Sequence, residues 1–153
     1  MFSKKTIRTD EKGFSILELL IVLLVFSLLL LPTMAYFNRY HRALLLDTTA
    51  KKIVEAVGLA RECAVNERKE FCVAFGEEGF SVLRENREPV AREQRFPVSV
   101  TVKEKSAGFN PAVLKPDGTA QTAGYLLLAD AVDGKEIKIV LHNLTGRCFI
   151  SND

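Results

Sequence analysis

Gly13-Phe14-Ser15-Ile16-Leu17-Glu18-Leu19-Leu20 opens the stretch of sequence that decides the fold. From Phe14 to Leu31 the chain runs for 18 residues with no charged side chain except that of Glu18. As a helix this segment would be roughly 27 Å long, close to the thickness of the hydrocarbon core of a bilayer. The stretch therefore predicts a membrane-spanning helix with one carboxylate near its N-terminal end.

The residues before this helix are basic. The first 13 residues set four basic side chains against Asp10 and Glu11, namely Lys4, Lys5, Arg8 and Lys12. Basic flanks stay on the cytoplasmic side of a membrane. We therefore expect a single-pass protein of the cytoplasmic (inner) membrane, with its N-terminus in the cytoplasm and the rest of the chain outside.

Three interpretations of the segment differ in what happens to it. A secretory signal would be cut near Thr33-Met34-Ala35, but the apolar core of such signals normally runs only about 7–15 residues and this one is longer. A plain signal anchor tolerates the length but gives no reason for Glu18. Cleavage between Gly13 and Phe14 does give a reason, since Phe14 would then carry a new α-amine one helical turn from the carboxylate.

The cost of that carboxylate explains why the amine matters. A carboxylate inside a membrane helix costs roughly 2.5–3.5 kcal/mol on insertion scales. An ammonium group offsets this cost, whether on the same chain or on a neighbouring chain packed one step along. Polar groups of this kind fix the register between helices. We expect Glu18 to set the register of assembly.

Residues 13–22 resemble the class III signal of type IV pilins and pseudopilins, a glycine followed by phenylalanine and by an acid at the fifth mature position. The matching residues are Gly13, Phe14 and Glu18. The resemblance implies cleavage after Gly13 by prepilin peptidase and N-methylation of Phe14. It also implies assembly with other pilins or pseudopilins through the inner-membrane assembly platform.

The helical pattern resumes after Pro32. Apolar residues recur at steps of three and four, at Leu46, Ala50, Ile53, Val57, Ala60 and Ala64, and so predict one buried stripe. Charged residues occupy the other faces, including Asp47, Lys51, Lys52, Glu55, Arg61 and Glu62. The helix is expected to end near residues 66–69. We expect a leader at 1–13, a membrane and assembly helix at 14–36, a helix continuation packing on the head at 37–69, and a β-rich head at 70–153.

From residue 70 the apolar pattern alternates with period two, which is typical of strands. A hairpin is expected around Gly76-Glu77-Glu78-Gly79, and alternating Val98, Val100 and Val102 predict a further strand. Shorter strands are expected at 111–114, 125–129, 137–141 and 148–150. The mixed-charge stretch at 84–95 fits a solvated edge and loop, or an arginine-based docking site. The predicted fold class is α+β, a long N-terminal helix packed on a mostly antiparallel head of roughly seven strands.

The head adds to the resemblance. Residues 109–120, 124–127, 137–140 and 145–147 look like the GspH/FimT class of minor pseudopilins, and residues 60–64 fit the same class. Competence pseudopilins of the ComGD kind share this layout. The resemblance implies a minor structural subunit at or near the filament tip. The machine could be type II secretion, a type IV pilus or a competence pilus.

We find no catalytic motif and expect neither an enzyme nor a cofactor. A metal site is not expected, because His41 and His142 are remote from the cysteines. The three cysteines, Cys63, Cys72 and Cys148, allow one disulfide with one thiol left over, or three small buried side chains.

DNA binding is the alternative function, since some FimT-like and competence pilins act in DNA uptake. Resemblance suggests that those members carry a Gly-Arg-x-Arg pattern near the C-terminus. Here Gly146-Arg147-Cys148-Phe149 keeps only the first arginine. The chain after residue 13 holds 17 basic and 17 acidic residues, which argues against a general polyanion-binding surface.

Overall fold

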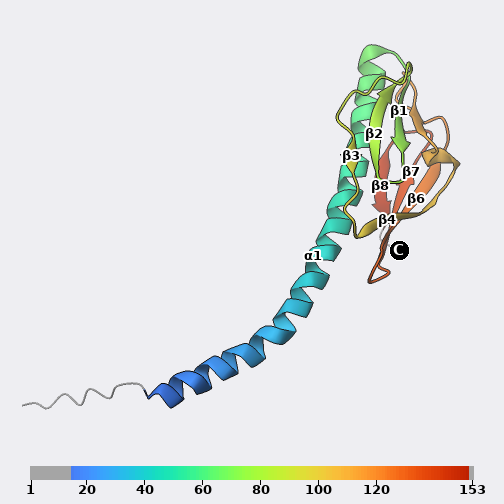
Figure 1. Ribbon diagram of the computed structural model, residues 1–153. Helices are drawn as coiled ribbons and strands as arrows, with labels where there is room; N and C mark the ends of the chain where they lie inside the picture. The colour runs from blue at the N-terminus through green and yellow to red at the C-terminus, as the bar shows by residue number, and fades with distance from the viewer. Residues whose placement is uncertain (1–14, 152–153) are drawn as a thin grey trace, which may run out of the picture. The chain divides into compact units, whose positions relative to one another are not determined.

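The computed structural model describes residues 15–151, apart from the side chains of residues 31–35. The chain falls into two units, one up to Asn38 and one from Arg39 onward. Helix α1 (Ile16–Glu67) contributes residues to both units, and every strand belongs to the second, here called the head (Figure 1). The expected leader at 1–13 and Phe14 lie outside the described residues.

Within the head, α1 buries one face against the strands. The six residues of the predicted stripe are all fully buried, so the stripe is confirmed: Leu46, Ala50, Ile53, Val57, Ala60 and Ala64. Arg68 follows the helix with φ at 52°, a left-handed conformation that commonly ends helices. The helix therefore ends at Glu67, within the range that the sequence indicated.

The head contains two antiparallel sheets of four strands each. The first has the order β3-β2-β1-β5, from β1 (Phe71–Phe75), β2 (Gly79–Arg84), β3 (Gln94–Arg95) and β5 (Ala112–Leu114). The second has the order β4-β6-β7-β8, from β4 (Val100–Lys105), β6 (Gly124–Asp130), β7 (Glu136–Leu141) and β8 (Cys148–Ser151). A 3-10 turn at Ala107–Phe109 leads from β4 to β5.

Both sheets share one hydrophobic core with the helix. Phe71 and Val73 enter it from the first sheet, Leu126 and Leu128 from the second, and all four are almost completely buried. Phe109 packs edge-on against Phe75, with ring centroids 5.5 Å apart. The α+β architecture and the antiparallel head are as predicted.

One detail of the predicted strands is wrong. Val98 was expected in a strand, but β4 begins at Val100 and Val98 is fully exposed (102 %) in a turn closed by Val100 N–H and Pro97 O. The mixed-charge stretch was expected to be a solvated strand edge and loop, and it contains the exposed edge strand β3. Gly79 and Phe80 of β2 pair with β3, because this edge of β2 would otherwise have unpaired peptide groups.

The alanines of the stripe should make the helix face intolerant of bulk. We expect Ala60→Leu to destabilise the protein by roughly 1–3 kcal/mol, because Ala60 is fully buried and the sheets cannot move away. Urea unfolding of the full chain in detergent, followed by circular dichroism, measures this. Gly58→Ala is the control, since an added methyl would touch nothing there, and it should stabilise by roughly 0.5–1 kcal/mol. Wild-type stability of Ala60→Leu would contradict the close packing.

Candidate functional site

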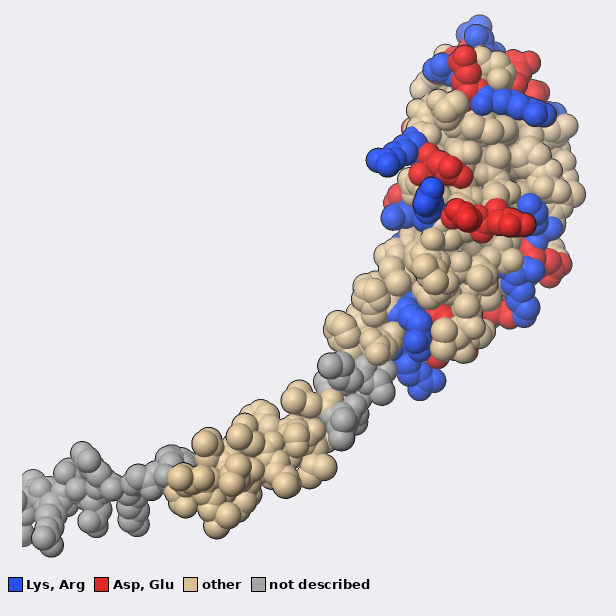
Figure 2. Space-filling model, viewed as in Figure 1, with Lys and Arg blue, Asp and Glu red and all other residues tan. Residues whose placement is uncertain are grey.

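Residues 16–30 of α1 expose apolar side chains on every side of the helix. All large apolar side chains from Ile16 to Leu30 are exposed, from 43 % at Val22 to 79 % at Ile16. The visible face of this segment in Figure 2 carries no charged side chain. An apolar surface of this extent requires cover by lipid or by other protein.

Ser15 and Glu18 form the start of α1. The Ser15 side chain accepts a hydrogen bond from the Leu17 N–H (3.3 Å), and its carbonyl accepts one from the Leu19 N–H (3.2 Å). Glu18 lies in the first helical turn, where the helix dipole favours a negative charge. Among the described residues, the Glu18 carboxylate has no ion-pair partner, so its predicted pairing with an amine stays a prediction.

Among residues whose side chains are described, no helix contains a window that is long and apolar enough to cross a membrane.

Where α1 enters the head, Arg42 joins the helix to the β6–β7 hairpin. Arg42 Nη2 donates to both carboxylate oxygens of Asp133, at 3.1 and 3.2 Å, and Arg42 Nε lies 3.9 Å from Asp130. Asp130 is buried at the end of β6 and accepts hydrogen bonds from the N–H groups of Val132 and Asp133. The β6–β7 hairpin is thereby fixed against the helix where the head begins.

The sequence analysis placed Asp130 and Asp133 between the expected strands at 125–129 and 137–141, and it gave no role to Arg42. One signal was available. Arg42 precedes Leu46 by four residues and so lies on the same helical face as the buried stripe. A cation on a buried face indicates an acidic partner across the interface.

The environment of Asp130 favours its charged form. The Val132 N–H contributes most to holding the pKa of Asp130 below its ordinary value of 3.8, and the Asp133 N–H and Arg42 add to this, while burial opposes it. A lowered pKa means that the ionised carboxylate stabilises the folded state. That stabilisation is complete above the ordinary pKa and is lost as the pH falls through the folded-state value.

We therefore expect Asp130→Asn to lower the melting temperature at neutral pH and to weaken its decline below about pH 4. Thermal unfolding of the full chain in detergent, followed across the acid range, tests both effects. Asp47→Asn is the matched control, because it removes a carboxylate from an exposed helical ion pair with Lys51. It should change the melting temperature and its acid-side decline very little. An unchanged acid-side slope in Asp130→Asn would contradict the assignment.

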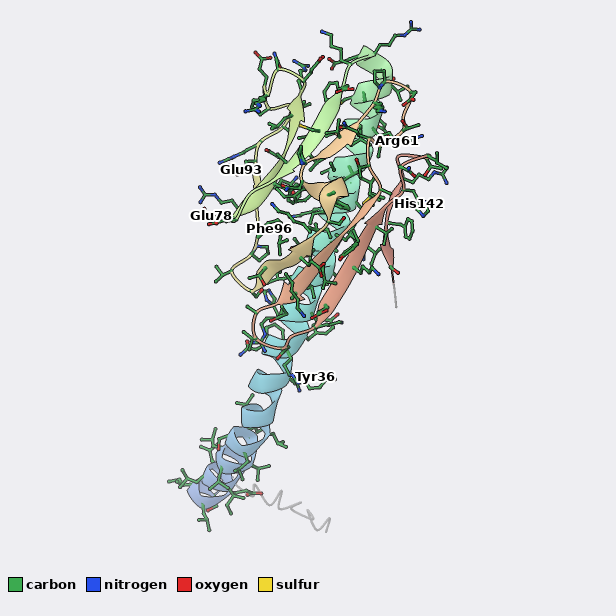
Figure 3. The ribbon with its side chains drawn as sticks, turned by 90° about the vertical axis from the view of Figure 1, so that its right-hand side faces the viewer. Tyr36, Arg61, Glu78, Glu93, Phe96 and His142 are labelled. Atoms are coloured by element: carbon green, nitrogen blue, oxygen red, sulfur yellow. The ribbon has the colours of Figure 1, made fainter. Side chains whose placement is uncertain are left out.

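A second arginine holds the far end of the head together. Arg61 Nε donates to the carbonyl of Gly118 (2.9 Å), in the turn after β5 (Figure 3). That turn contacts the β7–β8 turn, where Ala120 N–H donates to the Asn143 carbonyl (2.8 Å). Arg61 lies off the buried stripe, as the sequence indicated, and it is half-buried beside the two turns.

Gly146 is required where these two turns meet. Its φ is 58°, and a Cβ there would lie 2.2 Å from the Gly118 carbonyl oxygen. Gly134 has a similar φ of 66° in open space.

We expect Gly134→Ala to lower the free energy of unfolding by about 1 kcal/mol from backbone strain alone, and Gly146→Ala to lower it clearly more. Equal losses in urea unfolding would show that the turns can separate without cost.

The C-terminal turn has one arginine and one aromatic where two arginines would suit a phosphate backbone. Phe149 stacks on His142, with ring centroids 5.5 Å apart, and Arg147 is exposed. Figure 2 shows basic and acidic side chains interspersed on the visible face of the head. These features do not form a concentrated cationic surface for DNA.

The three cysteines lie on α1, β1 and β8, and all are free thiols in the structure. Burial is the main cause that raises the pKa of Cys63 and Cys72, and it raises the pKa of Cys148 to about 12. The thiols are therefore protonated at neutral pH and weakly nucleophilic. Within residues 15–151, no group of three His, Cys, Asp or Glu could hold a metal ion.

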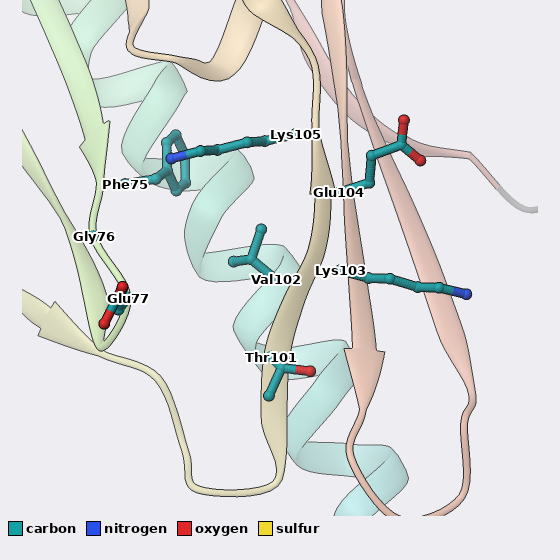
Figure 4. Close-up of a pocket in the computed structure, with 8 residues that line it drawn as sticks. All are labelled: Phe75, Gly76, Glu77, Thr101, Val102, Lys103, Glu104 and Lys105. Carbon is teal, nitrogen blue, oxygen red and sulfur yellow. The ribbon is translucent and has the colours of Figure 1, made fainter.

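The head has an open groove of about 480 Å³ between the end of β1 and the free edge of β4 (Figure 4). Phe75 and Val102 supply its apolar lining. Its charged lining residues are of both signs, namely Glu77, Lys103, Glu104 and Lys105.

Comparison with known proteins agrees with this architecture. Residues 8–34 match the family model of the prokaryotic N-terminal methylation motif. The chain has no significant sequence match among curated proteins. Among solved structures it resembles the type IV minor pilin FimU of Pseudomonas aeruginosa, with a TM-score of 0.57 at 17 % identity over 76 % of this chain and 92 % of FimU.

The minor pseudopilin EpsH of the Vibrio cholerae type 2 secretion system is similar to the same degree. Its TM-score is 0.57 at 11 % identity, over 69 % of this chain and 95 % of EpsH. The chain thus joins an N-terminal methylation motif to the fold of minor pilins and minor pseudopilins. Its fold is type IV pilin-like.

Proposed function

We propose that the protein is a minor structural subunit of a type IV pilus or a type II secretion pseudopilus. Prepilin peptidase removes residues 1–13, Phe14 is methylated, and residues 14–36 hold the subunit in the cytoplasmic membrane until it is assembled. The observation that carries the proposal is the combination of three features. The methylation motif at 8–34 overlaps a helical segment exposed on every side, and the head beyond it has the minor pilin fold.

The exposed apolar segment supports two successive environments. In the membrane, lipid covers residues 16–30, and in the filament the corresponding helices of neighbouring subunits cover them. The head stays outside the cytoplasm in both states. Passage from the membrane into the filament requires three kinds of partner. These are prepilin peptidase, the inner-membrane assembly platform, and other pilins or pseudopilins.

Glu18 links the two environments. It lies four residues after Phe14 and hence on the same helical face, one turn away. Cleavage creates the Phe14 amine, and the carboxylate can pair with that amine or with the amine of a neighbouring subunit. Pairing between subunits gains more as the helices leave water and lipid headgroups, because the attraction strengthens where the dielectric is low.

The neutral head fits a structural role better than a receptor role. FimU and EpsH come from different machines and share this fold, so the fold itself is compatible with either. A position at or near the filament tip would suit a subunit whose head differs from that of an abundant shaft subunit. DNA uptake would instead require duplex binding by the head that weakens steeply with salt.

The central test is substitution of Glu18. We expect Glu18→Val to be processed after Gly13 as in the wild type but to be largely absent from filaments, because the register pairing is lost. Intact-mass measurement reports cleavage and methylation, and immunoblotting of sheared filaments reports incorporation.

Glu18→Gln is the matched control for shape, since it keeps the size of the side chain and removes its charge. It should fail in the same way if charge sets the register. Normal incorporation of Glu18→Val would contradict the role of Glu18. Recovery of functional wild-type protein with residues 1–13 still attached would contradict the whole proposal.

A further inference from the structure

Two adjacent turns at the helix-entry end of the head carry exposed valines. Val98 occupies the turn before β4 and is 102 % exposed, and Val132 occupies the β6–β7 turn and is 67 % exposed. The Ala131 N–H donates to the Ser99 carbonyl (2.9 Å), which joins the two turns directly. Exposed turn positions usually carry polar residues or glycine, so a pair of valines on joined turns needs an explanation.

These turns are fixed beside the first helical residues of the head. Arg42 binds Asp133 in the β6–β7 turn, and Arg39 lies 3.9 Å from the same carboxylate. Both valine turns therefore belong to the end of the head at which the chain enters it, as the loops at the base of the head in Figure 1 show.

The chain at this point is close to the proposed membrane segment. Arg39 follows Leu31, the last residue of the uninterrupted apolar run, by eight residues. Eight helical residues measure ~12 Å. The interfacial region of one leaflet is roughly 5–8 Å deep. A straight helix normal to the bilayer would therefore hold Arg39 roughly 4–7 Å beyond the headgroups. A tilted helix narrows this gap, and the turns at the base of the head have only the remainder to span.

The charges around the valines suit a lipid surface. Arg39 has a side chain that is 74 % exposed, and Lys135, three residues after Val132, is exposed as well. Asp130 and Asp133 are engaged by Arg42 and by backbone N–H groups. The Arg39 side chain stays exposed although its Nε lies 3.9 Å from Asp133. Apolar tips flanked by exposed cations are the arrangement that binds the interface of an anionic bilayer.

We propose that the Val98 and Val132 turns rest on the outer surface of the cytoplasmic membrane before assembly, with both valines inserted among the headgroups and Arg39 and Lys135 beside lipid phosphates. This inference rests on the proposed function, because it needs the N-terminal helix in the bilayer. The contact holds the head of the unassembled subunit against the membrane, and extraction of the subunit into a filament breaks it.

Tryptophan fluorescence provides a direct test, because the chain contains no tryptophan. Val98→Trp places a single reporter at the proposed contact, on a side chain so exposed that the fold should tolerate the change. Leu144→Trp is the matched control. Leu144 is 81 % exposed in the β7–β8 turn, at the opposite end of the second sheet.

Each full-length variant is reconstituted in vesicles of phosphatidylcholine and phosphatidylglycerol, with and without brominated acyl chains. We expect the Val98→Trp emission to shift to the blue and to lose most of its intensity in brominated vesicles, while Leu144→Trp keeps a solvent-exposed spectrum. The quenching should weaken in vesicles of phosphatidylcholine alone, since the cations then lack anionic headgroups.

The other outcomes separate the two proposals. Reconstituted protein that floats with vesicles but shows the same unquenched emission at both positions overturns the surface contact alone. The same holds if Val98→Trp becomes shielded only after filament assembly, which would make the valines a contact between subunits. Protein that fails to float with vesicles overturns the membrane anchor, and with it both proposals.

Discussion

The packing of α1 against the two sheets is the constraint on which the head depends. Three of the six fully buried stripe positions are alanine, and the helix shares one hydrophobic core with both sheets. A shared core leaves little room for adjustment, because protein interiors are packed like crystals. The tie points on either side of the stripe are therefore as important as the stripe itself.

Those tie points are two arginines. Arg42 fixes the β6–β7 hairpin at the end where the chain enters the head, and Arg61 fixes the turns after β5 and β7 at the other. Together they join the helix to the head by directional polar contacts at both ends of an apolar face. Such contacts fix the helix along its axis, because a hydrophobic interface alone resists sliding poorly.

Sequence periodicity predicted what depends on local burial and missed what depends on distant partners. The helical stripe and the β1–β2 hairpin follow from periodicity along a single segment, and they were predicted correctly. The division of the strands into two sheets was not predictable, since alternation shows which face is buried but not which strand lies alongside. The contact between Arg61 and Gly118 was not predictable for the same reason, because the two residues are 57 positions apart.

The residues of the candidate site were also identified from local features of the sequence. Gly13, Phe14 and Glu18 were identified from chemistry that the sequence states by itself, a carboxylate in an apolar helix one turn from a potential amine. Among the described residues that carboxylate is exposed and has no ion-pair partner. The pairing of that carboxylate with the Phe14 amine stays a prediction, because its expected partner precedes the described residues or belongs to a second subunit. A role of this kind follows from the chemistry of the sequence, whereas the fold of one subunit reports only the partners within that subunit.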